Sequence, residues 1–166
     1  MSKTRYRATT WLTAFALLTP LPALSADFTR EQVAEQLAAL PNGGRINLAG
    51  KSLGGLDLSR LDFTGGDLHG ADLSGTNLFA AKFQDANLSG ANLSGASMGI
   101  MNVIRADLTD ANLTGADLHQ ADFIGANLAG ANLTGANAAG TNFEAAEIKD
   151  AIGLESVKSL DRKGAR

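Results

Sequence analysis

The chain has 166 residues, an apolar content of 45% and a formal net charge of −3. This length fits one domain and a short leader. Because the sequence holds no cysteine, the chain can form neither a disulfide nor a thiolate metal site or nucleophile of its own.

Residues 1–26 have the pattern of a secretory signal peptide. Three basic residues precede a nearly unbroken apolar stretch over residues 8–21, and small residues follow it. We expect cleavage after Ser25 or Ala26, and therefore a periplasmic or secreted protein. The alternative is an uncleaved anchor, but the apolar stretch is shorter than the ~20 residues that span a bilayer. No later segment is apolar enough to cross a membrane.

Removal of this leader would leave an acidic protein. The leader holds three of the 14 basic residues and none of the 17 acidic ones, so the remaining chain carries a net charge of −6. That balance disfavours nucleic acid and anionic lipid as partners.

Residues 27–45 contain a predicted helix and a turn. Thr29 is a good N-cap, Gln32 completes a capping box, and Phe28 and Val33 have the spacing of a hydrophobic staple. The Pro-Asn-Gly-Gly run at 41–44 ends the helix. We expect this helix to cover the open end of the region that follows, as repeat stacks require; a partner-binding helix is the alternative.

Residues 46–150 form 21 consecutive pentads without an insertion. Each pentad has an apolar central residue, position i, which is large in all but one of them (Ala138). Ala is usual at i−2, Asp or Asn at i−1, and Gly is frequent at i+2. Neither a helix nor a straight strand keeps i−2 and i on one side, so the chain must bend in every pentad. A fixed period of this kind is typical of a stacked repeat fold.

The aromatic residues indicate how many pentads make one coil. Phe63, Phe83, Phe123 and Phe143 are the only Phe residues at position i, and they are separated by multiples of 20, with Val103 in the gap. Twenty residues are four pentads, so each coil is expected to have four sides. About five coils at the ~4.8 Å spacing of neighbouring strands give a rod ~25 Å tall.

Units such as Ala86-Asn87-Leu88-Ser89-Gly90 closely resemble those of the pentapeptide-repeat proteins. The resemblance covers residues 46–150 and implies an all-β fold, a right-handed quadrilateral β-helix. Residues 151–166 follow it, with apolar residues at helical spacing, and we expect a second short helical cap there. Because some family members pair by their C-terminal ends, a homodimer through an end cap is the alternative role.

No catalytic, cofactor-binding or metal-binding residue is predicted. His69 and His119 are separated by ten pentads, or two and a half coils, which places them on opposite sides of the rod. The carboxylates at i−1 alternate with Asn along the chain, which indicates a surface or turn-bonding role for both. A catalytic pair would need two carboxylates in contrasting environments.

One departure from the repeat predicts an interaction patch. Met98, Met101 and Val103 indicate compensating changes in the core, and large apolar residues stand nearby at outward positions. The predicted patch comprises Phe79, Ile100, Ile104 and Ile124. Its alternative is a set of scattered surface residues, which is normal for soluble proteins.

These features predict a non-enzymatic structural or protein–protein interaction module that needs no cofactor and whose partner is an unknown protein. A second hypothesis is an acidic DNA mimic, because the resemblance includes cytosolic proteins that protect DNA gyrase and residues 46–150 carry 12 acids against five bases. The export signal argues against it. A third, an enzyme acting on envelope polysaccharide, has only the expected location and dispersed carboxylates in its favour.

Overall fold

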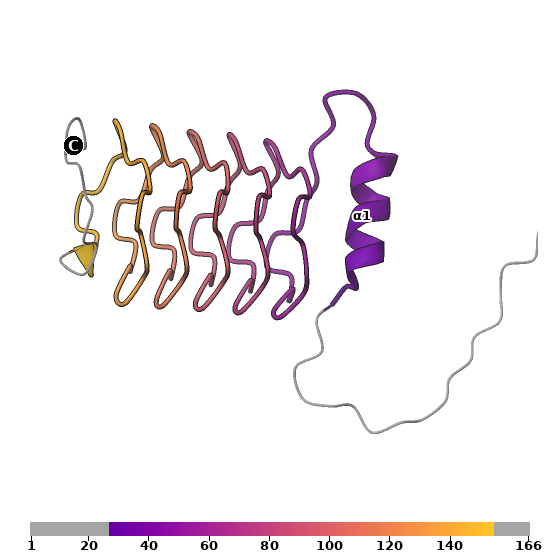
Figure 1. Cartoon of the computed structure of the whole chain (residues 1–166). Coiled ribbons are helices and arrows are strands. Elements are labelled where there is room, and N and C mark those ends of the chain that lie inside the picture. Colours follow the sequence, from indigo (N-terminus) through magenta and orange to yellow (C-terminus); the bar gives the residue numbers. More distant parts are fainter. Residues whose placement is uncertain (1–26, 155–166) are drawn as a thin grey trace, which may run out of the picture.

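A computed structural model describes residues 27–154 of the chain. They form one helix, α1 (Arg30–Ala39), followed by a stack of coils that runs away from it (Figure 1). No continuous strand is present in the described part, where neighbouring coils are joined by single-residue bridges. The predicted signal peptide and residues 155–166 of the predicted C-terminal cap lie outside the described residues.

Helix α1 begins at the predicted capping box. The Thr29 N–H donates to Oε1 of Gln32 over 2.8 Å, and the Gln32 N–H donates to Oγ1 of Thr29 over 3.4 Å. Val33 is fully buried and joins the core of the coils. The helix therefore packs against the core of the coils.

Two polar side chains beside α1 bind main-chain groups at the edge of the first coil. The Ser52 N–H donates to the Asp27 carboxylate over 2.9 Å, and the Asp27 N–H donates to the Ser52 carbonyl over 2.6 Å. The Arg30 guanidinium donates to the carbonyls of Asp57 and Ser59 over 2.5 and 3.2 Å. In later coils such groups are paired with the preceding coil, so these side chains replace the partners that a missing coil would supply.

Each coil contains four pentads, as predicted from the Phe spacing. Within residues 27–154, 18 parallel bridges join i−1 residues of successive coils, from Asn47 with Asp67 to Asn132 with Ile152. The Leu68 N–H donates to the Asn87 carbonyl over 2.7 Å, and the Asn87 N–H donates to the Gly66 carbonyl over 2.9 Å. The coils are thus held together as neighbouring strands are in a parallel sheet.

Four sides and four corners alternate around each coil. A side is formed by i−2, i−1 and i, and a corner by i+1 and i+2. Corner 1 comprises residues 49–50, 69–70, 89–90, 109–110, 129–130 and 149–150; corner 2 comprises 54–55, 74–75, 94–95, 114–115 and 134–135. Corner 3 comprises residues 59–60, 79–80, 99–100, 119–120 and 139–140; corner 4 comprises 64–65, 84–85, 104–105, 124–125 and 144–145. Side 4, between corners 3 and 4, comprises residues 61–63, 81–83, 101–103, 121–123 and 141–143.

The core is a column of side chains along the rod axis. The rings of Phe63 and Phe83 stack, and those of Phe123 and Phe143 have centroids 5.3 Å apart. Val103 fills the place between these two pairs and is fully buried, while Met101, which replaces the usual Ala at i−2, is 1% exposed. A larger residue at i−2 therefore accompanies a smaller one at i, as the sequence predicted.

Every corner turns through a left-handed residue at i+2. The Lys51 N–H donates to the Leu48 carbonyl over 3.1 Å across the first turn, where Gly50 has a φ of +64°. Glycine adopts this conformation freely. Nine other residues hold it without being glycine: Arg60, Ala80, Asp85, Ile100, Arg105, Asp110, Gln120, Ala145 and Asp150.

Candidate interaction surface

The structure places the four residues of the predicted patch around side 4. Phe79 and Ile100 lie on corner 3, and Ile104 and Ile124 lie on corner 4 in neighbouring coils, where the Arg105 N–H donates to the Ile124 carbonyl over 3.0 Å. Ile100 is 51% exposed, whereas the other three are half-buried. The four residues therefore frame side 4 and do not form one continuous apolar plane.

Corner 3 brings together an aromatic and an imidazole ring that the sequence analysis did not connect. The ring centroids of Phe79 and His119 lie 6.5 Å apart. Gly99 lies between their coils, and a Cβ atom on it would collide with the His119 ring. Glycine at this place allows the imidazole to lie against the backbone. Phe79 and His119 are eight pentads apart in the sequence, which is two complete coils and places both on the same corner. This spacing could have identified the pair.

The left-handed residues that are not glycine are unevenly distributed over the four corners. Within residues 27–154, corner 3 holds four of the nine and corner 4 holds three, whereas on corner 2 glycine makes every one of these turns. An L-residue in this conformation costs about 1–2 kcal/mol. Ile100 is the extreme case, because β-branched residues with positive φ are genuine outliers. The backbone strain therefore accumulates beside the apolar residues.

Two charged side chains on corner 4, Arg105 and Asp85, are paired along the rod. The Arg105 guanidinium binds the Asp85 carboxylate with two hydrogen bonds of 2.7 and 2.8 Å. These bonds raise the pKa of Arg105 and are the main cause of the lowered pKa of Asp85, to which nearby Arg45 also contributes. Gly65 leaves room for the Arg45 side chain, since a Cβ atom there would lie 3.0 Å from its Nε.

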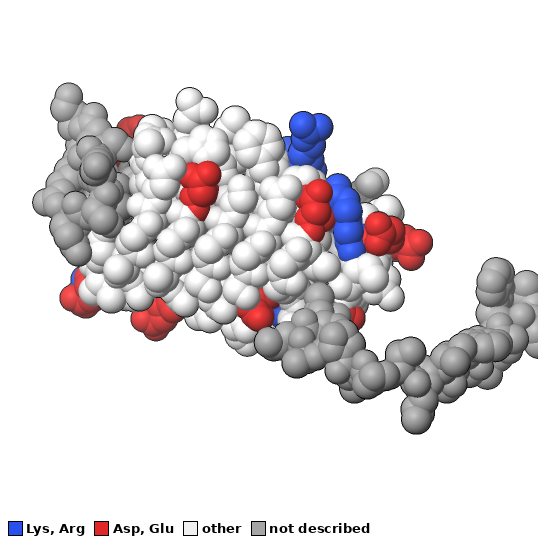
Figure 2. All heavy atoms as spheres, turned by 60° about the horizontal axis from the view of Figure 1, so that its bottom comes forward, with Lys and Arg blue, Asp and Glu red and all other residues white. Residues whose placement is uncertain are grey.

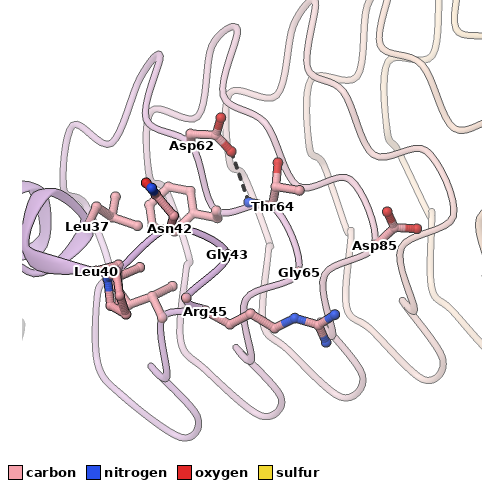
Figure 3. Close-up of a pocket in the computed structure, with 13 residues that line it drawn as sticks. Leu37, Leu40, Asn42, Gly43, Arg45, Asp62, Thr64, Gly65 and Asp85 are labelled. Atoms are coloured by element: carbon pink, nitrogen blue, oxygen red, sulfur yellow. Dashed lines mark hydrogen bonds between the residues drawn. The ribbon is translucent and has the colours of Figure 1, made fainter.

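A hollow of about 470 Å³ lies where α1 meets the first coil near corner 4 (Figure 3). Leu37 and Leu40 of the helix segment line one side, and the Arg45 side chain extends along the coils toward Asp85. Asp62 accepts a hydrogen bond of 3.0 Å from the Thr64 N–H. Partial burial raises the pKa of Asp62, but hydrogen bonds from Thr64 and the nearby Lys82 outweigh it, so the pKa of Asp62 is lowered. The charged side chains that line this hollow are thus one basic and two acidic groups, Arg45, Asp62 and Asp85.

The two histidines lie on different corners and bind separate carboxylates. Nδ1 of His69 is 3.2 Å from the Asp67 carboxylate, and Nδ1 of His119 is 2.9 Å from that of Asp117. His69 belongs to corner 1 and His119 to corner 3, on opposite sides of the rod as predicted. In residues 27–154 no group of three or more His, Asp or Glu side chains could hold a metal ion.

Carboxylates and amides at i−1 stabilise the turns. The Ser59 N–H donates to Oδ1 of Asp57, and the Ala49 N–H donates to Oδ1 of Asn47, both over 3.0 Å. This confirms the turn-bonding role predicted for these residues. The amide of Asn77 also donates to the Asp57 carboxylate of the previous coil over 3.1 Å.

Asp and Asn are nevertheless not interchangeable along the rod. None of the 18 bridges in the described part joins two acidic residues. An amide can donate to a carboxylate one coil away, whereas two stacked carboxylates would repel each other. On the face drawn in Figure 2 the acidic side chains are scattered and form no continuous stripe. The described residues also contain no helix with the length and apolar content of a membrane span.

Comparisons with known proteins agree with this geometry. A family model described as Pentapeptide repeats matches eight copies, over residues 45–78, 102–137 and 126–152, which together make up just over half of the chain. A comparison with curated proteins found no match.

Three solved structures are similar to the chain. Rfr23, a pentapeptide repeat protein from the cyanobacterium Cyanothece 51142, is 26% identical, with a TM-score of 0.50 over 74% of this chain and 82% of Rfr23. A pentapeptide repeat protein of the Arabidopsis thaliana thylakoid lumen is 31% identical, with a TM-score of 0.48 over 70% of each chain.

QnrB1, a plasmid-mediated fluoroquinolone resistance protein, is 20% identical, with a TM-score of 0.51 over 67% of this chain and 55% of QnrB1. At this identity the likeness concerns the fold alone. The family match and the similar folds imply a right-handed quadrilateral β-helix. The chain belongs to the pentapeptide-repeat family.

Proposed function

We propose that this protein is a non-enzymatic interaction module of the bacterial periplasm or extracellular space, and that it binds a protein partner through corners 3 and 4. The observation that supports this most strongly is the accumulation of apolar and strained residues on these corners. Seven of the nine left-handed residues that are not glycine lie there, within residues 27–154, together with Phe79, Ile100, Ile104 and Ile124.

Backbone strain supports a functional role for this surface. A glycine in place of Ile100 would relieve the backbone strain and would also remove an isoleucine side chain that is 51% exposed. Strained backbone residues are found preferentially at functional sites. Corner 2 serves as an internal reference, because the same turn is made there by Gly75, Gly95 and Gly115 at no such cost.

The residue types on these corners suit a protein partner. Exposed apolar groups beside arginine and an aromatic ring are typical of protein interfaces. The carboxylates described above bind turns or basic side chains, which leaves no pair in the contrasting environments that acid–base catalysis requires. This supports the non-enzymatic assignment.

Covered ends of the rod are consistent with a protein that folds as a separate module. We infer that α1 is the N-terminal cap, because Asp27 and Arg30 bind edge groups of the first coil. The corresponding role at the other end is assigned to residues 151–166. Covered ends prevent open strand edges from pairing with other chains.

The alternative is an acidic DNA mimic of the gyrase-protecting type. The net acidity of the repeats favours it, and so does the fold shared with QnrB1. A mimic of duplex DNA needs closely spaced rows of negative charge. The described coils stack no acid on another acid, and Arg105 and Lys82 pair with acids on corner 4 and side 4. These observations favour the interaction module.

Two aspartate substitutions would test the proposed surface. Ile104→Asp with Ile124→Asp should abolish capture of envelope proteins by the immobilised mature chain. The matched control is Thr114→Asp with Thr134→Asp, at the same i+1 position on corner 2, and it should capture as the unmodified protein does. Equal capture by both double variants would contradict the proposal.

Cell fractionation would test the location separately. We expect the mature protein, without residues 1–26, in the periplasmic or culture fraction. Cytosolic protein that retains these residues would overturn the assigned compartment and revive the DNA-mimic alternative.

A further inference from the structure

We infer that side 4 packs against side 4 of a second copy of this chain. The two rods run antiparallel, and the two-fold axis of the dimer lies at the coil of Asn102. This inference rests on the proposed function, since it names the partner of the same surface. In such a pair the coil of Asn102 faces itself, and each coil before it faces the corresponding coil after it.

The period of the rod is the first argument for a second copy. Outward residues on side 4 recur once per coil, and main-chain hydrogen bonds between the coils fix their spacing. A partner with the same period meets every coil in register, whereas a helix or an extended strand has a different rise per repeat. A two-fold interface uses one surface patch on both molecules, which must therefore be self-complementary.

Three of the residues on the axis are apolar or uncharged. Ile100, Asn102 and Ile104 belong to one coil and lie on corner 3, side 4 and corner 4 in that order. Each would face its own copy. Ile100 is exposed, while Asn102 and Ile104 are half-buried. The axis thus joins apolar side chains at both corners and an amide, which can both donate and accept, in the middle.

The residues beside the axis have opposite charges. Lys82 precedes Asn102 by one coil and Asp122 follows it by one coil, so the antiparallel pair sets each Lys82 against an Asp122 of the second copy. The Lys82 side chain is 62% exposed and lies 3.4 Å from Asp62. The Asp122 carboxylate accepts a 3.2 Å bond from the Ile124 N–H and has no basic partner within residues 27–154.

The outer coils contribute no like-charge pair on side 4. Asp62, two coils before the axis, would face Asn142. Arg105 lies in the coil of Asn102 and would face its own copy, and the Asp85 carboxylate of its own chain compensates its charge. Because one side of a five-coil rod is a small interface, we expect a reversible dimer rather than an obligate one.

A single cysteine provides a direct test, since the chain has none of its own. Asn102→Cys places two thiols against each other on the axis, so the full mature chain should form a disulfide-linked dimer under mild oxidation. Asn92→Cys is the matched control, because Asn92 is also a half-buried i−1 residue that accepts a bond from the N–H two residues on. The control should remain monomeric. Equal cross-linking rates for the two variants would overturn the dimer.

A charge exchange tests the register by an independent route. Lys82→Asp and Asp122→Lys should each weaken association by at least about tenfold, because each brings like charges together. The double variant should restore it. Sedimentation equilibrium measures all four proteins, and circular dichroism verifies their folding. A double variant that associates no better than the single variants would contradict the antiparallel register.

The two proposals can fail separately. If the protein is monomeric at all concentrations but Ile104→Asp with Ile124→Asp still abolishes capture of another protein, the surface is a binding surface for a different partner and the dimer is wrong. If the dimer forms but neither Ile100→Asp nor Ile104→Asp weakens it, the interface lies elsewhere.

Discussion

The rings of Phe63 and Phe83 stack inside the rod with their centroids 4.6 Å apart. Each ring lies in the core of its own coil and contacts the other ring, so the pair joins neighbouring coils through the core. Phe83→Ala should therefore lower the free energy of unfolding by about 3–5 kcal/mol, the usual cost of a large cavity. Urea denaturation followed by circular dichroism would measure it. Phe83→Leu serves as a control, since it should cost clearly less; an equal loss would contradict this role of the ring.

Arg30→Ala should loosen the first coil selectively. The guanidinium satisfies the carbonyls of Asp57 and Ser59, and its loss leaves both at an edge that α1 partly covers. We expect a loss of about 1.5–3 kcal/mol in the free energy of unfolding, as for hydrogen bonds to a charged group. Hydrogen exchange should rise in residues 46–65 and stay unchanged beyond the second coil.

Arg60→Ala is the control for that experiment. The Arg60 side chain forms no hydrogen bond or ion pair with any described residue, and it is exposed on corner 3. Its removal should leave exchange in the first coil unaltered. If both variants had the same effect, the capping role of Arg30 would be rejected.

Ile100→Gly should stabilise the protein while weakening its binding. Glycine relieves the left-handed strain of Ile100, whose φ is +55°, and we expect a gain of about 1 kcal/mol in the free energy of unfolding. The same change removes an exposed apolar group from the proposed interface. Thermal denaturation and analytical ultracentrifugation would measure the two effects. Gly95→Ile on corner 2 is the reverse control and should destabilise the fold; a destabilised Ile100→Gly variant would contradict the strain argument.

Acid should weaken the pair between Asp85 and Arg105. The hydrogen bonds from Arg105 hold the pKa of Asp85 below its ordinary value of about 3.9. A lowered pKa in the folded state adds stability above the ordinary value, and this contribution is lost as pH falls through the lowered pKa. The melting temperature of the natural protein should therefore decrease more between about pH 5 and pH 2 than that of Asp85→Asn.

Arg105→Gln should reproduce the behaviour of Asp85→Asn, because it removes the donors that lower the pKa of Asp85. If the melting temperatures of all three proteins fell equally over this pH range, the pair would make no pH-dependent contribution to stability.

Much of the fold could be predicted because the repeat acts through local chemistry. The spacing of Phe63 and Phe83 fixes a coil of four pentads, and Thr29 with Gln32 marks the start of α1, since a capping box involves residues three apart. Both predictions are confirmed by the bridges and by the cap hydrogen bonds. The compensating sizes of Val103 and Met101 could likewise be predicted, because adjacent core positions must together fill one volume.

Features that depend on placement across coils were not predicted. The pairing of Asp27 with Ser52 requires the position of α1 on the rod, which no periodicity encodes. Ala80 and Ile100 adopt left-handed turns that their residue types disfavour, so only the neighbouring coils impose that conformation. The four patch residues were predicted as outward, and three of them are half-buried because adjacent coils shield one another.

Photocross-linking in living cells would show which corners of the rod contact a partner. A benzophenone amino acid at Ile104, on corner 4, should yield adducts with a second copy or another protein. The same group at Thr114, on corner 2, should yield few. Adducts from Thr114 that equal or exceed those from Ile104 would contradict the claim that this rod binds its partner through corners 3 and 4.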